Sequence, residues 1–152
     1  MPTANYEDLD DLLTRIHVAR QRPGWRRRLL DASGPVTSVS TVRVLRAVEQ
    51  AHRRVGTASV KDVAEYAGVE HSTASRMVAG VVASGLVTKA SSTEDQRRCD
   101  LVLTERGRDA LAALTDRRRK AVAELVAGWP DADVDHLVTL LDRLAASIEA
   151  TS

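Results

Sequence analysis

The chain has 152 residues, 43% of them apolar and 28% charged, a composition that fits a soluble globular protein with one sizeable core. No apolar run approaches the roughly 20 residues of a membrane span, and the acidic N-terminus is unlike a signal peptide. We therefore expect a cytoplasmic protein with no membrane partner. One cysteine excludes an intramolecular disulfide framework.

The N-terminal third predicts three helices. Residues 5–21 carry apolar side chains at three- and four-residue steps, as in an amphipathic helix: Tyr6, Leu9, Leu12, Leu13 and Ile16. Pro23-Gly24 ends this pattern, and a short basic helix is expected over residues 25–32 before Ser33-Gly34-Pro35. The next apolar stripe predicts a helix from Val36 to about His52.

Two more helices are expected on either side of a glycine turn. The first covers residues 60–67, Gly68 and Val69 form the turn, and the second runs from about Ser72 to Ala83. Small and apolar residues occupy the inward positions: Val63, Ala64, Ala67, Val69, Ala74, Met77 and Val78. The exposed start of the second helix keeps His71, Ser72, Thr73, Ser75 and Arg76, which suit contacts with base edges and phosphates. An ordinary polar surface is the alternative.

A β-hairpin is predicted after Gly85, from two strand-like runs at residues 86–89 and 99–103. The polar loop between them holds Asp95, Arg97 and Arg98. An arginine on such a wing can enter a narrow minor groove, where the potential is most negative; a solvated tip with a local Asp–Arg pair is the alternative. The prediction is a winged helix–turn–helix, mainly α with a small β-hairpin wing.

The C-terminal residues predict a helix over 105–127, with Thr104 as its N-cap, and a last helix capped by Asp131 or Asp133. These helices and the N-terminal one expose more apolar surface than a small domain covers, which favours pairing with a second copy of the chain.

The charge of the chain does not by itself favour DNA binding. The net charge is only +1, and residues 57–100 are nearly neutral. Phosphate contacts are therefore expected from dispersed cations: Arg53, Arg54, Lys61 and Lys89.

The order of elements resembles the MarR family of bacterial transcriptional regulators. Four motifs carry the resemblance: S-T-x-S-R-M-V (residues 72–78), G-L-V (85–87), D-x-R (Asp95 and Arg97) and L-T-x-x-G (103–107). It implies that Arg97 contacts the minor groove while Asp95 orients the wing, with Arg98 as an extra cation. It also implies a homodimer formed by the terminal helices, and release from DNA by a small aromatic or phenolic ligand. Glu70 departs from the family pattern and is a poor N-cap.

We therefore predict a homodimeric transcriptional repressor that binds a pseudo-palindromic double-stranded DNA operator. Dimerisation helices are assigned to residues 1–35 and 105–152, and the DNA-binding region to residues 36–104, within one compact fold. The predicted DNA-binding residues are His71, Ser72, Thr73, Ser75, Arg76, Lys89, Asp95, Arg97 and Arg98. No enzyme motif, metal ligand set or cofactor site is predicted, and the ligand-binding residues are unknown. The alternatives are a protein-interaction module that does not bind DNA, and a thiol-based sensor that uses Cys99.

Overall fold

The computed structural model describes residues 5–30, 34–36, 38–91 and 99–151. The chain divides into two compact units, Met1–Arg118 and Arg119–Ser152, and each is described by itself. No helix within the described ranges is both long and apolar enough to cross a membrane. The assignment of residues 1–35 and 105–152 to dimerisation stays a prediction.

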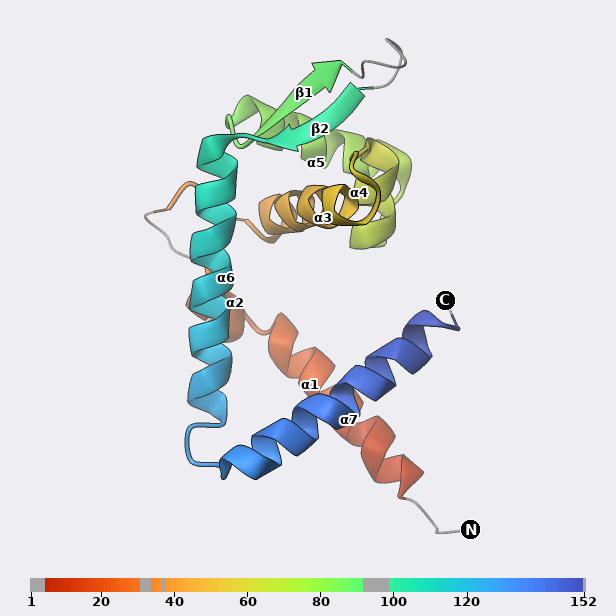
Figure 1. Cartoon of the computed structure of the whole chain (residues 1–152), viewed down its shortest axis with the longest axis vertical. Coiled ribbons are helices and arrows are strands. Elements are labelled where there is room, and N and C mark those ends of the chain that lie inside the picture. Colours follow the sequence, from red (N-terminus) through yellow and green to blue (C-terminus); the bar gives the residue numbers. More distant parts are fainter. Residues whose placement is uncertain (1–4, 31–33, 37, 92–98, 152) are drawn as a thin grey trace. The chain divides into compact units, whose positions relative to one another are not determined.

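Seven helices and one hairpin are present in the described part of the chain, which confirms the mainly-α winged fold (Figure 1). Their bounds are α1 (Tyr6–Gln21), α2 (Pro23–Leu29), α3 (Val39–Val55), α4 (Val60–Ala67), α5 (His71–Ala83), β1 (Val87–Ser91), β2 (Cys99–Leu103), α6 (Glu105–Leu125) and α7 (Asp131–Glu149). The strands pair antiparallel, with Val87 opposite Leu103 and Lys89 opposite Leu101.

The helix boundaries follow local capping, and several of the predicted boundaries were wrong. Helix α2 spans Pro23–Leu29 rather than residues 25–32, because proline is tolerated in the first turn of a helix. Helix α3 begins at Val39 rather than Val36, because Ser38 has an extended backbone and its side chain accepts from the Thr41 N–H. At the other end of the chain, Pro130 occupies the N-cap position of α7, and no side chain caps this helix. Asp131 and Asp133 lie in its first turn. Their negative charges interact favourably with the positive end of the helix dipole there, but neither side chain caps the helix.

Glycine permits the two sharp direction changes around α5. Gly68 ends α4 with φ of 65°, and Gly85 follows α5 with φ of 76°, both in the left-handed region that other residues rarely adopt. Each therefore allows the chain to reverse within one residue. The predicted turn at Gly68 and the predicted stop at Gly85 are confirmed.

One hydrophobic core unites α3, α4, α5, the hairpin and the first turns of α6. The largest fully buried side chains come from α3, α4, α5, the hairpin and the residue before it, and none comes from α6: Val44, Leu45, Val48, Val63, Val78, Leu86, Val87 and Leu101. Ala64 and Ala74 are also buried, as expected for small residues at a close helix crossing. Because α5 contributes Ala74, Val78 and Val81 to this core, its remaining faces turn toward solvent.

A close approach of α6 to the start of the hairpin fixes where the wing leaves the helical core. Thr104 donates from its hydroxyl to Gly85 O at 2.7 Å and from its backbone N–H to Leu86 O at 3.1 Å. The same hydroxyl oxygen accepts from Gly107 N–H, which confirms Thr104 as the N-cap. A Cβ at position 107 would collide with the Leu86 carbonyl group. The glycine of L-T-x-x-G is thus needed for space.

Candidate DNA-binding surface

The first two turns of α5 present the polar surface that the sequence predicts. His71, Ser72, Ser75 and Arg76 are exposed and Thr73 is half-buried, while Ala74 and Val78 point into the core. This division follows from the helical period, since residues 74 and 78 share one face. Five of the nine predicted DNA-binding residues therefore lie together on one rigid element.

An open groove of about 590 Å³ runs beside this surface, between α4 and α5. Its lining includes Lys61 and Glu65 from α4, Glu70 from the turn, and His71 and Thr73 from α5. Glu70 occupies the N-cap position of α5 but makes no side-chain capping bond. The Glu70 carboxylate therefore accepts no hydrogen bond from the backbone N–H groups at the start of α5, as expected for a residue type that caps helices poorly.

Ion pairs engage three of the four cations that the sequence offers for phosphate contacts. Arg53 Nη2 lies 2.9 Å from Glu49 Oε1, Arg54 Nη2 lies 3.6 Å from Asp62 Oδ1, and Lys61 Nζ lies 3.8 Å from Glu65 Oε1. All three cations are mostly exposed, so the pairs are weak and can exchange for phosphate. Local charge pairing thus lowers the number of cations near the helix–turn–helix that are free of an acidic partner.

The wing residues are only partly within the described structure. Lys89 is exposed on β1, opposite the buried Leu101. Asp95, Arg97 and Arg98 lie outside the described residues, and their roles stay predictions. Cys99 is exposed at the start of β2, opposite Ser91, and its role as a thiol sensor also stays a prediction.

A polar cluster at the base of the wing was missed by the sequence analysis. His52 Nε2 on α3 lies 2.8 Å from Leu101 O and 3.4 Å from Asp100 Oδ1, and Ala58 N–H donates to Asp100 Oδ1 at 2.8 Å. Ala58 is not in a strand and makes one backbone bond to β2, from Leu101 N–H. The available signal was a carboxylate inside an apolar strand, Cys99-Asp100-Leu101-Val102-Leu103.

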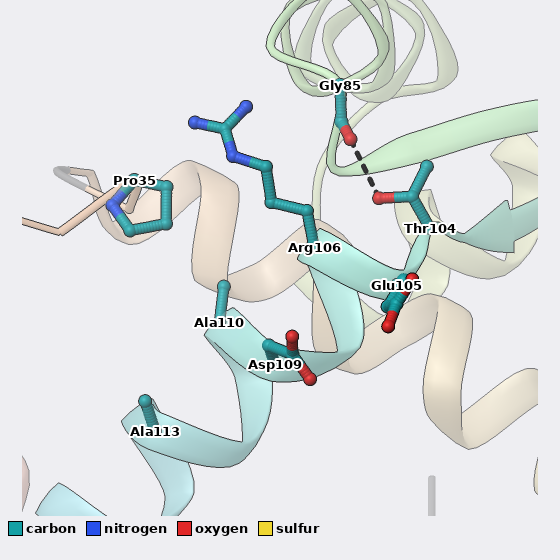
Figure 2. A pocket seen from close by; sticks show the side chains of 8 residues that line it. All are labelled: Pro35, Gly85, Thr104, Glu105, Arg106, Asp109, Ala110 and Ala113. Atoms are coloured by element: carbon teal, nitrogen blue, oxygen red, sulfur yellow. Dashed lines mark hydrogen bonds between the residues drawn. The ribbon is translucent and has the colours of Figure 1, made fainter.

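A second groove, of about 620 Å³, lies where Pro35 and Gly85 face the start of α6. Figure 2 shows Arg106 extending between Pro35 and Gly85, with Glu105 beside it at the start of α6 and Asp109 on the next turn. Arg106 Nη1 donates to Ser84 O at 2.8 Å, so this guanidinium also ties the end of α5 to α6. The groove thus contains charged groups of both signs beside a small apolar wall of Ala110 and Ala113.

Comparison with known proteins identifies a family match for part of the chain. Residues 36–98 match the model of the MarR family. This segment, which is less than half of the chain, is similar to the MarR family. MarR family proteins are transcriptional regulators and not enzymes, so the coarse function of the chain is that of a DNA-binding transcriptional regulator. The sequence has no match among curated proteins.

Solved structures share the MarR fold over nearly the whole chain. A MarR family protein from Bacillus stearothermophilus is 20% identical, with a TM-score of 0.77 over 98% of this chain and 99% of its own. RV1404 from Mycobacterium tuberculosis is 24% identical, with a TM-score of 0.71 over 97% and 95%. BpsR from Bordetella bronchiseptica, whose DNA binding is regulated by 6-hydroxynicotinic acid, is 19% identical, with a TM-score of 0.64 over 91% and 98%. At these identities the likeness concerns the fold.

Proposed function

We propose that the chain is a cytoplasmic, homodimeric repressor that binds a pseudo-palindromic operator and is released by a small aromatic or phenolic ligand. The observation that carries the DNA-binding part is the exposed polar start of α5, held on a buried apolar face. Short hydroxyl side chains at Ser72, Thr73 and Ser75 permit close approach to base edges, and Arg76 is suited to guanine or phosphate. His71 lies at the edge of the same surface.

The wing supplies the second contact in this proposal. Arg97 enters the minor groove beside the recognition helix, with Arg98 as a second cation and Asp95 orienting the loop. Lys89, exposed on β1, contacts the phosphate backbone. A minor-groove arginine gains from the negative potential there, so it adds affinity even though the helix–turn–helix has few unpaired cations.

Dimerisation is supported by unsatisfied apolar faces on the terminal helices. Helix α1 has no buried residue, and Tyr6, Leu9, Leu12 and Ile16 are all exposed. Helix α7 likewise has no buried residue and exposes Val138, Leu140, Leu141 and Ile148. Apolar stripes of this size are unfavourable in water, and a second copy of the chain is the partner that every expressed protein meets. A two-fold dimer presents two α5 helices to half-sites roughly 34 Å apart.

Ligand control is proposed by analogy with BpsR, whose DNA binding responds to 6-hydroxynicotinic acid. A ligand that binds better to a dimer with the wrong α5 spacing would shift the population away from the DNA-bound form. In this proposal the bound protein is a repressor, so its release by ligand turns expression on. The ligand class, an aromatic or phenolic anion, is testable by its effect on operator affinity.

The deciding experiment is selection of bound duplexes from a random DNA library at about 150 mM salt, followed by titration of the selected operator. We expect an enriched inverted repeat, and Arg97→Ala should weaken binding to it at least tenfold, or about 1.4 kcal/mol. Arg119→Ala, which removes an exposed arginine of α6, is the charge control and should bind as wild type. Equal binding by Arg97→Ala would refute the wing contact. No enrichment by a folded dimer would instead favour the protein-interaction function.

A further inference from the structure

The outer edge of β2 is closed by groups from α3 and from the segment between α3 and α4, rather than by a third strand. Leu101 N–H donates to Ala58 O at 2.9 Å, and Leu101 O accepts from His52 Nε2 at 2.8 Å. Both backbone groups would otherwise be unpaired at the edge of a two-stranded sheet. Because a carbonyl oxygen only accepts, this bond also requires that His52 carry a proton on Nε2.

Asp100 adds a side-chain bond at the same place. Its Oδ1 accepts from Ala58 N–H at 2.8 Å, and the carboxylate side chain is only 19% exposed. Ala58 is 2% exposed, so its N–H has lost access to water and depends on this acceptor. Ala58 therefore meets β2 through both of its backbone groups, one bonded to Leu101 and the other to the Asp100 side chain.

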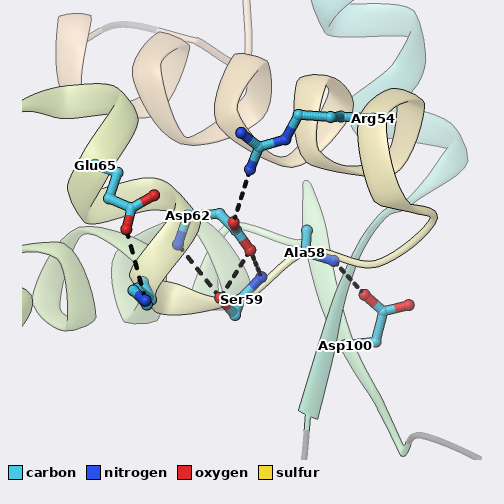
Figure 3. A network of polar contacts seen from close by, with 7 residues as sticks. Arg54, Ala58, Ser59, Asp62, Glu65 and Asp100 are labelled. Atoms are coloured by element: carbon cyan, nitrogen blue, oxygen red, sulfur yellow. Dashed lines mark hydrogen bonds and ion pairs between the residues drawn. The ribbon is translucent and has the colours of Figure 1, made fainter. Parts of the chain in front are cut away.

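The hydrogen bond from Ala58 N–H to Asp100 lies where α3, α4 and the wing meet (Figure 3). Ala58 directly precedes Ser59, whose N–H and hydroxyl both donate to Asp62 Oδ2 in the capping box of α4. Arg54 from α3 approaches the same Asp62 carboxylate. A displacement of β2 would consequently disturb the start of α4, which packs directly on α5.

We propose that Asp100 and His52 are positioning residues for DNA binding, which hold the wing at a fixed place relative to the recognition helix α5. The proposal rests on the DNA-binding function proposed above. Neither residue contacts DNA in this scheme. Their effect is preorganisation, because a wing that is already oriented loses less freedom when it enters the minor groove than a wing free to tilt on its hairpin.

Paired variants separate the hydrogen bond from the charge. Asp100→Ala and Asp100→Asn both remove the negative charge, but only the asparagine keeps an oxygen that can accept from Ala58 N–H. We expect Asp100→Ala to weaken operator binding roughly tenfold, the size of a lost hydrogen bond to a charged group, and Asp100→Asn to retain most of the affinity. His52→Ala and His52→Gln form the second pair, since the glutamine amide can still donate to Leu101 O. Equal losses within each pair would overturn the proposal.

A double-mutant cycle tests whether the effect passes through the wing. Operator affinity is measured by fluorescence anisotropy for wild type, Asp100→Ala, Arg97→Ala and the double variant, at a salt concentration where all four bind. The Asp100→Ala loss should disappear in the Arg97→Ala background, whereas a general loss of folding would be additive. Additivity overturns the inference. Should Asp100→Ala be unfolded by circular dichroism, the same cycle is run with His52→Ala.

The two proposals fail differently in this design. A folded wild-type chain that selects no operator refutes the proposed function, and the inference with it. A wild-type chain that binds its operator and loses binding in Arg97→Ala, yet keeps full binding in Asp100→Ala and His52→Ala, refutes only the positioning role.

Discussion

Replacing Gly107 by alanine should be among the most damaging single-methyl changes in this chain. The new Cβ would fall far inside contact distance of Leu86 O and 2.9 Å from the Leu86 carbonyl carbon, where contacts under 3.0 Å essentially never occur. Both groups belong to backbone, so no side-chain rotation relieves the collision. Helix α6 and the segment before β1 must therefore move apart by about an ångström.

The magnitude follows from what this movement breaks. It stretches the bonds from Thr104 N–H to Leu86 O and from Thr104 Oγ1 to Gly85 O, each worth roughly 0.5–1.5 kcal/mol. It also displaces Leu86, which is fully buried, at a cost of about 1–3 kcal/mol for overpacking. The helix propensity of alanine offsets about 1 kcal/mol. We expect a net loss of roughly 3 kcal/mol, or about 6–12 °C in Tm for a domain of this size.

Thermal unfolding followed by circular dichroism, at one fixed protein concentration, measures this loss. Gly80→Ala is the matched control, because Gly80 is also a helical glycine and a Cβ there meets nothing within 4 Å. It should raise Tm slightly through helix propensity alone. If Gly107→Ala unfolds at the same temperature as Gly80→Ala, then α6 does not approach Leu86 as closely as described, and the account of the L-T-x-x-G motif fails.

Two further predictions concern the DNA-facing charges and the exposed helix α1. Glu65→Gln should release Lys61 from its ion pair, so that the slope of log affinity against log salt concentration steepens by about one unit. Glu149→Gln at the end of α7 is the control. An unchanged slope in Glu65→Gln would count against Lys61 as a phosphate contact. Leu12→Asp should dissociate the proposed dimer in sedimentation experiments, because a carboxylate cannot be buried unpaired in an apolar interface. Thr14→Asp, at another exposed position of α1, should leave the dimer intact, and persistence of the Leu12→Asp dimer would exclude this face of α1 from the interface.

The sequence by itself determined the elements, because the signals that set them act over a few residues. The helical period separates Ala74 and Val78 from Ser72 and Ser75, and the positive φ angles fall at Gly68 and Gly85 as a turn and a stop require. The local signal was misjudged by two residues at the start of α2 and by three at the start of α3, and at α7 the predicted capping residue was wrong.

Only the tertiary structure decided which groups meet across the chain. His52 and Leu101 are 49 positions apart, and Ala58 and Asp100 are 42 apart, so no periodicity or spacing relates them. The space requirement at Gly107 likewise arises from Leu86, which a different element supplies. Ion pairing has the same origin for Arg54 and Asp62, which α3 and α4 bring together. Local propensity fixes the backbone of each element, whereas the hydrogen bonds and charges that join elements exist only after the core has packed.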